Sequence, residues 1–527
     1  MNSSGDSTGV ISRSANRFFV GTLLSRATGM FRDMAMAFAF GTSSAVASFM
    51  MALRFAHLLR RILGEGTLQP AFAPLFEELR KNSPSDACHF FRDLSATLTV
   101  ILTAIIALSM SVLGAIIVYS DVTANNKEVL LLTILMLPSL LFICSFSINT
   151  LLLQCERSFL TPSIAPVAFN VIWIAGALSL RNYHASIAMP YLSIAIILAC
   201  LGQWLVTLPR TLSFYRAHTT EALWQGCRIF SQQVRRLGKP LALGILGVTA
   251  SQINSAIDTI FARSADAEGP ALLWYAIRIQ QVPIGLFGVA LSGALLPPLS
   301  RAIKQGQSQE FTQFFRFALQ RNTTIMLPFT LALILLGAPG INLVFGRGLF
   351  SDASTTGTTW CLWGYAIGLL PMTLVLVIAP TYYARENYIV PMTASVVSVI
   401  VNIILNAIMI FYCGWGPASV AVATSLSAWI NVAILTYGLR KHGGVTSFYD
   451  AIRGTRRLAT ATLWATMMTV VIATLLFKEP TLGLITGQEI VHFPRYFLEQ
   501  LSYFFLPAGC FVGMLFLLTK KEDFYVV

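Results

Sequence analysis

The chain has 527 residues, of which 55% are hydrophobic and 11% charged, and its mean hydropathy is +0.69. These values exclude a soluble globular protein, which would need far more polar surface at this length, and place the chain among polytopic membrane proteins. The net charge of +13 and the pI near 9.5 would suit nucleic-acid binding, but the placement of the basic residues explains them without it.

The chain opens with a Ser/Gly-rich leader, Met1 to Ser14, before its first apolar run. That run contains Arg26, Arg32 and Asp33, whereas a secretory signal peptide places its basic residues ahead of a purely apolar segment. We therefore expect a first membrane helix and no cleavable signal peptide.

The hydropathy pattern predicts an all-α membrane protein with about fourteen transmembrane helices, because a helix of about 20 apolar residues spans a bilayer. The expected spans are 16–41, 44–64, 93–119, 129–154, 162–180, 187–208, 240–262, 271–297, 323–346, 357–380, 390–412, 415–438, 457–477 and 497–518. An even number of spans puts both termini on the same side of the membrane.

The basic residues support this topology. With the amino terminus in the cytoplasm, the cytoplasmic segments hold 24 of the 36 Lys and Arg residues and the opposite loops hold six. Such a bias indicates the cytoplasmic side. The basic loops 210–239 and 440–457 suit contact with anionic lipid headgroups, so membrane lipids are expected partners and nucleic acid is not.

Arg17 and Arg457 stand at the cytoplasmic ends of their spans and are counted with the cytoplasmic residues. The remaining six arginines lie inside predicted spans: Arg26, Arg32, Arg54, Arg60, Arg61 and Arg278. An arginine near the bilayer centre costs roughly 2.5 to 3.5 kcal/mol on insertion scales, so such residues normally face a watery cavity. Asp33 is the one carboxylate beside them within these spans. The pattern indicates a positive cavity that binds an anion; the alternative is arginines at helix ends that extend to the interface.

The sequence spacing of these charged residues distinguishes a supporting ion pair from arginines that could bind an anion. Arg61 and Glu65 stand at i,i+4, which suits a supporting ion pair. Arg60 has no acidic residue three or four positions away, and Asp33 is placed to orient the guanidinium of its neighbour Arg32. Guanidinium groups match phosphate oxygens with paired N–H donors and keep their charge in a low-dielectric site, so a diphosphate would complement the cavity.

The chain carries a faint internal repeat. One constant offset in the numbering relates Arg54 to Arg278 and Pro74 to Pro298, and Pro162 and Pro391 each open a predicted helix after a short turn with Glu and Arg. Two six-helix lobes in the same orientation, with the cavity between them, explain this repeat. The expected organisation is 1–15 leader, 16–210 first lobe, 211–239 cytoplasmic linker, 240–440 second lobe and 441–527 two further helices with a cytoplasmic tail.

Enzyme and metal motifs are sparse. The eight cysteines stand singly without a CxxC pair, which favours core residues over a disulfide framework or a metal site. No DxD, HxxxxD or Gly-rich phosphate loop lies in a fitting context, so we expect a transporter and no enzyme.

The arginine-rich opening resembles the MurJ (MviN) family, the lipid II flippases of bacterial peptidoglycan synthesis, whose superfamily includes multidrug exporters. The matching runs are Ser25–Asp33, Phe40–Gly41, Leu58–Gly66, Gln69–Pro74, Trp274–Arg278, Gly288–Leu291, Leu296–Pro297 and Ala379–Arg385. The resemblance implies fourteen helices in two lobes plus a pair that forms a groove for the lipid tail. It places Arg32, Asp33, Arg60 and Arg278 in the central cavity, with Arg26, Arg61 and Glu65 as supporting charges.

The chain departs from this pattern where relatives carry acidic residues, because it has Ala47 and Gln281 there. The resemblance to sodium-binding members also suggests a cation site at Asp258, Asn402, Asn406 and Thr424. Ordinary hydrogen bonding between helices is the other interpretation of these four residues.

The resemblance implies a lipid II flippase of the bacterial inner membrane with both termini in the cytoplasm and no cofactor, driven by sodium or the membrane potential. The cell-wall synthesis machinery is a candidate partner. A flippase for another polyprenyl diphosphate-linked oligosaccharide shares the arginines, while a multidrug cation exporter would line its cavity with carboxylates. A non-transporting assembly scaffold is the remaining alternative.

Overall fold

The computed structural model describes residues 8–60, 68–219, 226–288, 291, 298, 301–303, 305–306, 308–439, 453–477 and 491–519. Within this part every regular element is helical, as expected. The contacts between residues group the chain into two compact units, Met1–Ala256 and Ile257–Val527.

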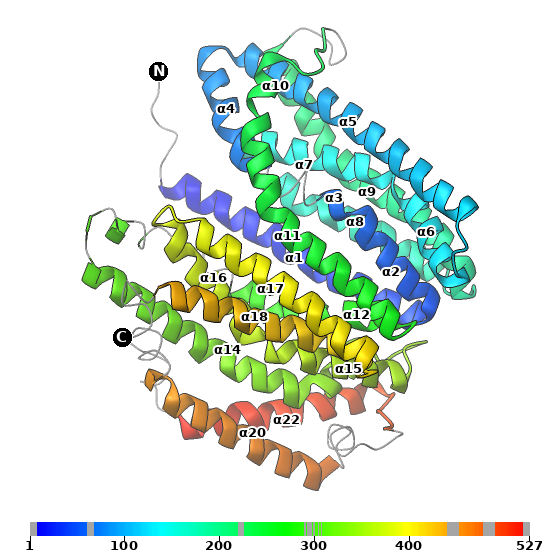
Figure 1. Ribbon diagram of the computed structural model, residues 1–527, viewed down its shortest axis with the longest axis vertical. Coiled ribbons are helices and arrows are strands. Elements are labelled where there is room, and N and C mark those ends of the chain that lie inside the picture. Colours follow the sequence, from blue (N-terminus) through cyan, green and yellow to red (C-terminus); the bar gives the residue numbers. More distant parts are fainter. Residues whose placement is uncertain are drawn as a thin grey trace. The chain divides into compact units, whose positions relative to one another are not determined.

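The first unit is built from long and short helices, shown in blue to green in Figure 1. They are α1 (Thr8–Phe40), α2 (Ser44–Ala56), α3 (Leu58–Arg60), α4 (Leu68–Asn82), α5 (Pro84–Tyr119), α6 (Ala124–Met136), α7 (Ser139–Cys155), α8 (Leu160–Ser179), α9 (Ala185–His218) and α10 (Gln232–Arg236). The division between the units falls within α11 (Gly238–Ala265). α1 packs on α8, and α8 and α7 pack on α9.

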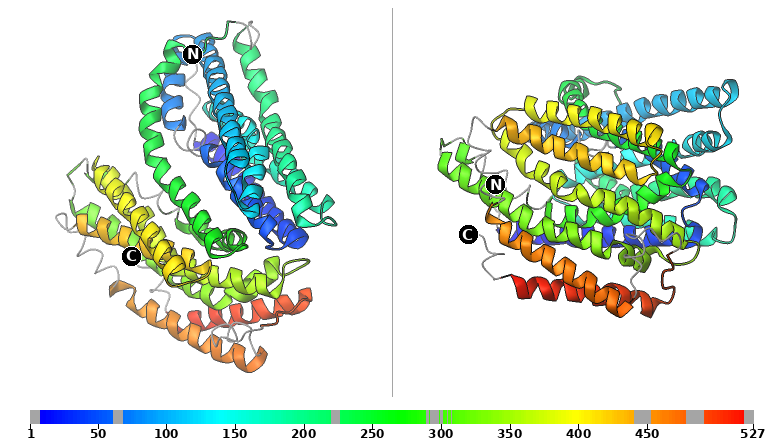
Figure 2. Two further views of the ribbon diagram at one scale, coloured as in Figure 1. Left: turned by 45° about the vertical axis from the view of Figure 1, so that its right-hand side comes forward. Right: turned by 60° about the horizontal axis from the view of Figure 1, so that its bottom comes forward.

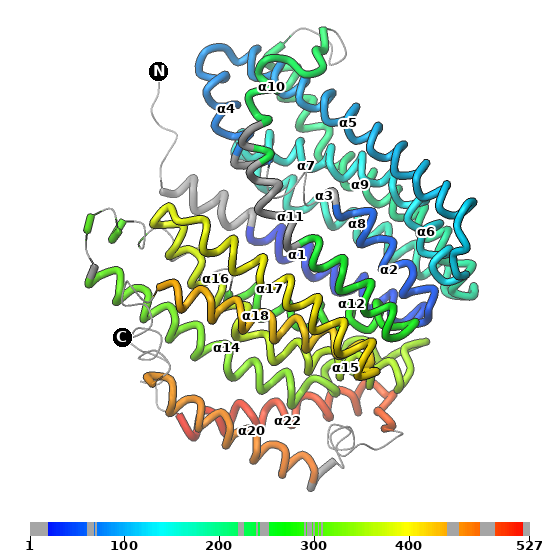
Figure 3. Tube along the Cα trace, in the orientation of Figure 1, coloured from blue at the N-terminus to red at the C-terminus, as the bar shows by residue number. Residues whose placement is uncertain are grey.

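The second unit continues from α11 to the end of the chain. It contains α12 (Gly269–Pro283), the π-helix η2 (Ile284–Gly288), α14 (Ser308–Phe345), α15 (Asp352–Ile367), α16 (Leu369–Tyr383), α17 (Ile389–Ala407), the π-helix η3 (Ile408–Tyr412), α18 (Ala418–Gly438), α20 (Arg456–Phe477) and α22 (Phe497–Leu518). α17 and α18 lie side by side in the trace of Figure 3. α20 and α22 pair with each other and pack on α14 (Figure 2).

In the described residues, each of the fourteen predicted spans overlaps a helix or a pair of helices. Within the described residues, nine helices are long and apolar enough to cross a membrane, and the bent pair α6 and α7 makes a tenth. The other four spans lie on α1, α2 with α3, α11, and α12 with η2. They include every span with an expected intramembrane arginine, and α2 has only 13 residues. The number fourteen stays a prediction.

Two helices were not expected from the sequence. α4 buries Leu68, Phe72, Phe76 and Leu79 against α5, and its ring of Phe72 stacks on Phe90 at 5.6 Å. These four residues follow helical spacing, but the segment is too short and polar to span a bilayer, so only its periodicity reveals it. α10 adds Val234 to the same hydrophobic cluster.

The internal repeat is visible in the turns before α8 and α17. Arg157 and Glu386 have positive φ angles of 54° and 58°, and they stand at the same offset as Pro162 and Pro391. In the first turn Ser158 N–H donates to Leu153 O, and in the second Asn387 N–H donates to Tyr382 O. In both turns the helix therefore ends at a residue with left-handed backbone, and the N–H of the next residue donates to the carbonyl five positions earlier.

Candidate functional site

An ion pair on α1 forms the centre of the first polar cluster. Arg32 Nε and Nη2 donate to Asp33 Oδ1 at 3.0 and 2.8 Å, and the side chains are 11% and 2% exposed. The carboxylate therefore directs the guanidinium and also offsets its charge. α1 approaches α8 closely because Gly21 has no side chain: a Cβ atom there would lie 2.1 Å from Ser163 Oγ.

α8 holds the same guanidinium from the other side. Asn170 Oδ1 accepts from Arg32 Nη1 at 3.1 Å, and the Asn170 amide donates to Ser25 O and Thr28 Oγ1 at 3.2 and 3.0 Å. The guanidinium carbon lies 4.5 Å from the ring centre of Trp173, which suits a cation–π contact. Sequence reasoning missed Asn170 and Trp173, because an Asn and a Trp in an apolar helix look like ordinary interior residues.

The other arginines of the first unit differ in their surroundings. Arg54 Nη1 donates to Ser255 O at 3.0 Å and so joins α2 to α11. Arg60 ends the short helix α3 and is half-buried, while Arg26 is exposed on α1. Arg61 and Glu65 lie outside the described residues, so their ion pair stays a prediction.

Arg278 belongs to the second unit. It lies on α12, half-buried, and its guanidinium carbon is 4.2 Å from the ring centre of Trp274. α12 passes at Pro283 into the π-helix η2, a distortion that frequently marks functional sites in helices. The convergence of Arg278 with Arg32 and Arg60 on one cavity stays a prediction.

The second polar cluster brings together all four residues of the expected cation site. Asn406 Nδ2 donates to Asp258 Oδ1 at 3.1 Å and to Asn402 Oδ1 at 2.9 Å. Thr424 Oγ1 donates to Asp258 Oδ2 at 3.2 Å and accepts from Asn402 Nδ2 at 3.3 Å. α11, α17 and α18 thus meet at one buried carboxylate, which is 7% exposed.

The chemistry of this cluster fits a hard monovalent cation. The four side chains offer oxygens from one carboxylate, two amides and one hydroxyl, the ligand type that hard cations prefer. Asn402 and Asn406 are fully buried, so a single negative charge would be matched by a single positive one in a dry environment. Hydrogen bonding between the same side chains also satisfies the carboxylate, so the geometry suits both interpretations.

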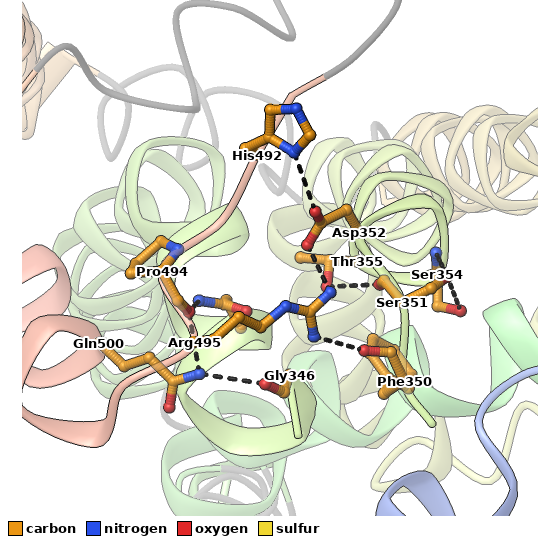
Figure 4. Close-up of polar contacts among 11 residues, drawn as sticks. Gly346, Phe350, Ser351, Asp352, Ser354, Thr355, His492, Pro494, Arg495 and Gln500 are labelled. Carbon is orange, nitrogen blue, oxygen red and sulfur yellow. Dashed lines mark hydrogen bonds and ion pairs between the residues drawn. The ribbon is translucent and has the colours of Figure 1, made fainter. Parts of the chain in front are cut away.

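A third cluster fixes the segment before α22 to the turn between α14 and α15. Arg495 Nη2 donates to Asp352 Oδ1 at 2.6 Å and Arg495 Nη1 to Phe350 O at 2.8 Å (Figure 4). Gln500 Nε2 donates to Gly346 O and Pro494 O, both at 3.1 Å. The last helix pair is therefore attached to the rest of the second unit by hydrogen bonds as well as by apolar packing.

We expect Arg495→Ala to lower the free energy of unfolding by about 1 kcal/mol, because it removes a partly exposed ion pair and one hydrogen bond to a carbonyl. Thermal unfolding in detergent measures the loss. Asp352→Ala should act on the same interaction, so the double variant should cost less than the sum of the two single changes. His492, which is 82% exposed on the other side of Asp352, serves as a control: His492→Ala should change little. Additive losses from Arg495 and Asp352 would contradict the assignment.

Known proteins resemble this chain along most of its sequence. The family model described as "Lipid II flippase MurJ" matches residues 36–492. A "Probable lipid II flippase MurJ" of Chlamydia muridarum is 32% identical over 530 residues, which cover 98% of this chain and 95% of that protein. The "Lipid II flippase MurJ" of Burkholderia cenocepacia is 28% identical over 434 residues, which cover 80% and 82% of the two chains.

Solved structures share the fold of this chain. A structure of "Lipid II flippase MurJ, inward closed conformation" has a TM-score of 0.72 at 23% identity and covers 94% of this chain and 99% of that one. An inward-facing multidrug resistance MATE family transporter of the MOP superfamily has a TM-score of 0.61 at 14% identity and covers 84% and 99%. The chain is a multi-pass membrane protein, and it belongs to the lipid II flippase MurJ family.

Proposed function

We propose that this chain carries lipid II, a polyprenyl diphosphate-linked disaccharide peptide, from the cytoplasmic to the periplasmic leaflet by alternating access between its two lobes. Membership of the family supports this function. The transported lipid keeps all its covalent bonds, so the chain acts as a transporter and not as an enzyme. A bacterial inner membrane with both chain termini in the cytoplasm is the setting that the basic residues favour.

The observation that carries the proposal is the way Arg32 is held. Asp33, Asn170 and Trp173 fix its guanidinium from three sides, while three of its five N–H groups are used. A guanidinium fixed in advance loses little entropy when it binds a phosphate, so its remaining donors can act on a diphosphate at low cost.

Arg60 and Arg278 complete the proposed diphosphate site, and Arg26 and Arg54 extend it. A diphosphate carries enough negative charge to engage several guanidinium groups at once. Its polyprenyl tail would stay in the hydrocarbon, next to the groove proposed for α20 and α22.

The energy source in this proposal is sodium or the membrane potential. Asp258, Asn402, Asn406 and Thr424 would hold the sodium ion. An inside-negative potential would also favour return of the empty, positive cavity to the cytoplasm, because one charge that crosses 100 mV gains about 2.3 kcal/mol.

Purified protein in vesicles tests the function. The vesicles carry fluorescent lipid II in the inner leaflet, and a reagent that cannot cross the membrane reports its arrival outside. We expect wild-type protein to expose lipid II and to discriminate against a polyprenyl monophosphate carrying the same sugars. Equal transport of both lipids would contradict the diphosphate site, and transport of lipophilic cations instead of lipid II would indicate an exporter.

A further inference from the structure

Two helix breaks lie next to each other in the first unit. α2 ends at Ala56, His57 interrupts the helix, and α3 follows. α6 and α7 are bent by 46° at a break that contains Pro138. α2 packs on α6 and α3 packs on α7, so the two breaks face each other.

A chain of two hydrogen bonds joins these breaks. His57 Nε2 lies 3.1 Å from Ser139 Oγ, and Ser139 Oγ donates to Met136 O at 2.6 Å. The hydroxyl of Ser139 has one proton, which Met136 O receives, so His57 must donate through Nε2. Met136 O needs this bond because Leu140 N–H, its ordinary partner in a continuous helix, donates to Leu137 O instead.

We call this hydrogen-bonded connection between a broken helix and its neighbour the joint. The second unit contains a corresponding joint with different side chains. The offset that relates Pro162 to Pro391 also places Met136 on Tyr365 and Ser139 on Gly368, where α15 ends and α16 begins. There Gln280 Nε2 of α12 donates to Tyr365 O at 3.0 Å. Gln280 is 3% exposed and directly precedes Gln281, the position that corresponds to His57 when Arg54 is aligned with Arg278.

Because the joint occurs in both units, it is not an incidental contact. Hydrogen bonds between helices inside a membrane protein are each worth about 0.6 kcal/mol on average, and many of them are replaceable. In the first unit Ser139 donates to Met136 O and His57 bonds Ser139, whereas in the second unit Gln280 donates to Tyr365 O, which also accepts from Gly368 N–H. In both units a side chain from the arginine-bearing segment thus reaches the corresponding break. Both donors stand beside an arginine of the proposed site: Arg60 follows His57 by three residues, and Arg278 precedes Gln280 by two.

We propose that His57 and Gln280 are positioning residues, which fix the direction of Arg60 and Arg278 by tying their helices to the broken helix beside them. This inference rests on the proposed function for its consequence, but the joint itself can be tested without lipid. His57 acts through Ser139 and Met136 O, whereas Gln280 reaches Tyr365 O directly.

The first experiment measures the position of residue 60. Arg60→Cys is introduced into a chain whose eight native cysteines are replaced, and the rate of thiol labelling is followed in detergent. We expect His57→Ala to change this rate about fivefold, as loss of a hydrogen bond of about 1 kcal/mol implies, and His57→Gln, which keeps a donor of similar reach, to restore it. Gln280→Ala should have the same effect on the labelling of Arg278→Cys.

Asn149→Ala is the matched control. Asn149 is buried and donates to Thr207 Oγ1 at 3.2 Å, so the change removes an interhelical hydrogen bond of α7 that involves neither break. It should lower thermal stability and leave labelling at residue 60 unchanged. Labelling that His57→Ala leaves unchanged, or that Asn149→Ala changes equally, would overturn the proposal.

Measurements of lipid II binding then test the role of Arg60 as a ligand separately from the existence of the joint. With native Arg60, His57→Ala should weaken binding about fivefold, and the effect should vanish in the Arg60→Ala background, because coupled residues are not additive. Altered labelling without altered lipid II binding would support the joint and count against Arg60 as a diphosphate ligand. Equal weakening of binding in both backgrounds would overturn the positioning role.

Discussion

Removal of the Arg32 guanidinium should weaken lipid II binding about 10- to 100-fold, because a hydrogen bond to a charged group contributes roughly 1.5 to 3 kcal/mol. The single change Arg32→Ala also leaves Asp33 buried at 2% exposure without its cation. A buried carboxylate that loses its partner destabilises a protein strongly. The informative variant is therefore Arg32→Ala combined with Asp33→Asn, which removes both charges, and binding of lipid II to the purified protein is the measurement.

Milder substitutions of Arg32 and of its partner Asn170 should weaken lipid II binding to smaller extents. Arg32→Lys keeps the charge but loses the planar fork that Asp33 and Asn170 hold, so binding should recover only in part. Asn170→Ala keeps the arginine and frees one of its N–H groups, so we expect a smaller loss than for Arg32→Ala. Arg216, an exposed arginine on α9, is the control, and Arg216→Ala should bind like the wild type. Wild-type affinity in the double variant of Arg32 and Asp33 would refute the diphosphate site.

The helices were predictable because their apolar runs are long. The three spans that contain the expected intramembrane arginines also overlap helices within the described residues, because isolated arginines are good helix formers and do not interrupt a helix. α4 escaped prediction because its apolar face, from Leu68 to Leu79, belongs to a helix of only 15 residues in which charged side chains are interspersed with apolar ones. A search for amphipathic periodicity outside the spans would have found it.

The sequence reveals some residues of each polar cluster and hides others. The charges of Arg32 and Asp33 stand out in an apolar helix, but Asn170 and Trp173 become visible only when α8 packs on α1. Asp258 was suggested by resemblance, and its hydrogen bonds to Asn406 and Thr424 depend on the packing of three helices. Helix breaks at His57 and Pro138 leave no hydropathy signal, so the joint between them follows from the fold alone.

Neutralisation of Asp258 should abolish the specific effect of sodium on this protein. A cation that binds only the folded state stabilises it by about 2.7 kcal/mol at one hundred times its Kd, so we expect wild-type protein to melt at a higher temperature in NaCl than in KCl of equal ionic strength. Asp258→Asn has nearly the same shape but lacks the charge that the ion requires. Its melting temperature should be the same in the two salts, and its lipid II transport should no longer depend on sodium.

Thr424 distinguishes a cation site from hydrogen bonding between helices. Thr424→Val keeps the shape and removes the hydroxyl that bonds Asp258 Oδ2, whereas Thr424→Ser keeps the hydroxyl. If the cluster binds sodium, Thr424→Val should reduce the difference between the two salts and Thr424→Ser should retain it. If the cluster serves only to join α11, α17 and α18, Thr424→Val should lower the melting temperature equally in NaCl and KCl. A wild-type protein that melts at one temperature in both salts would exclude the sodium site, because linkage requires a ligand of the folded state to stabilise it.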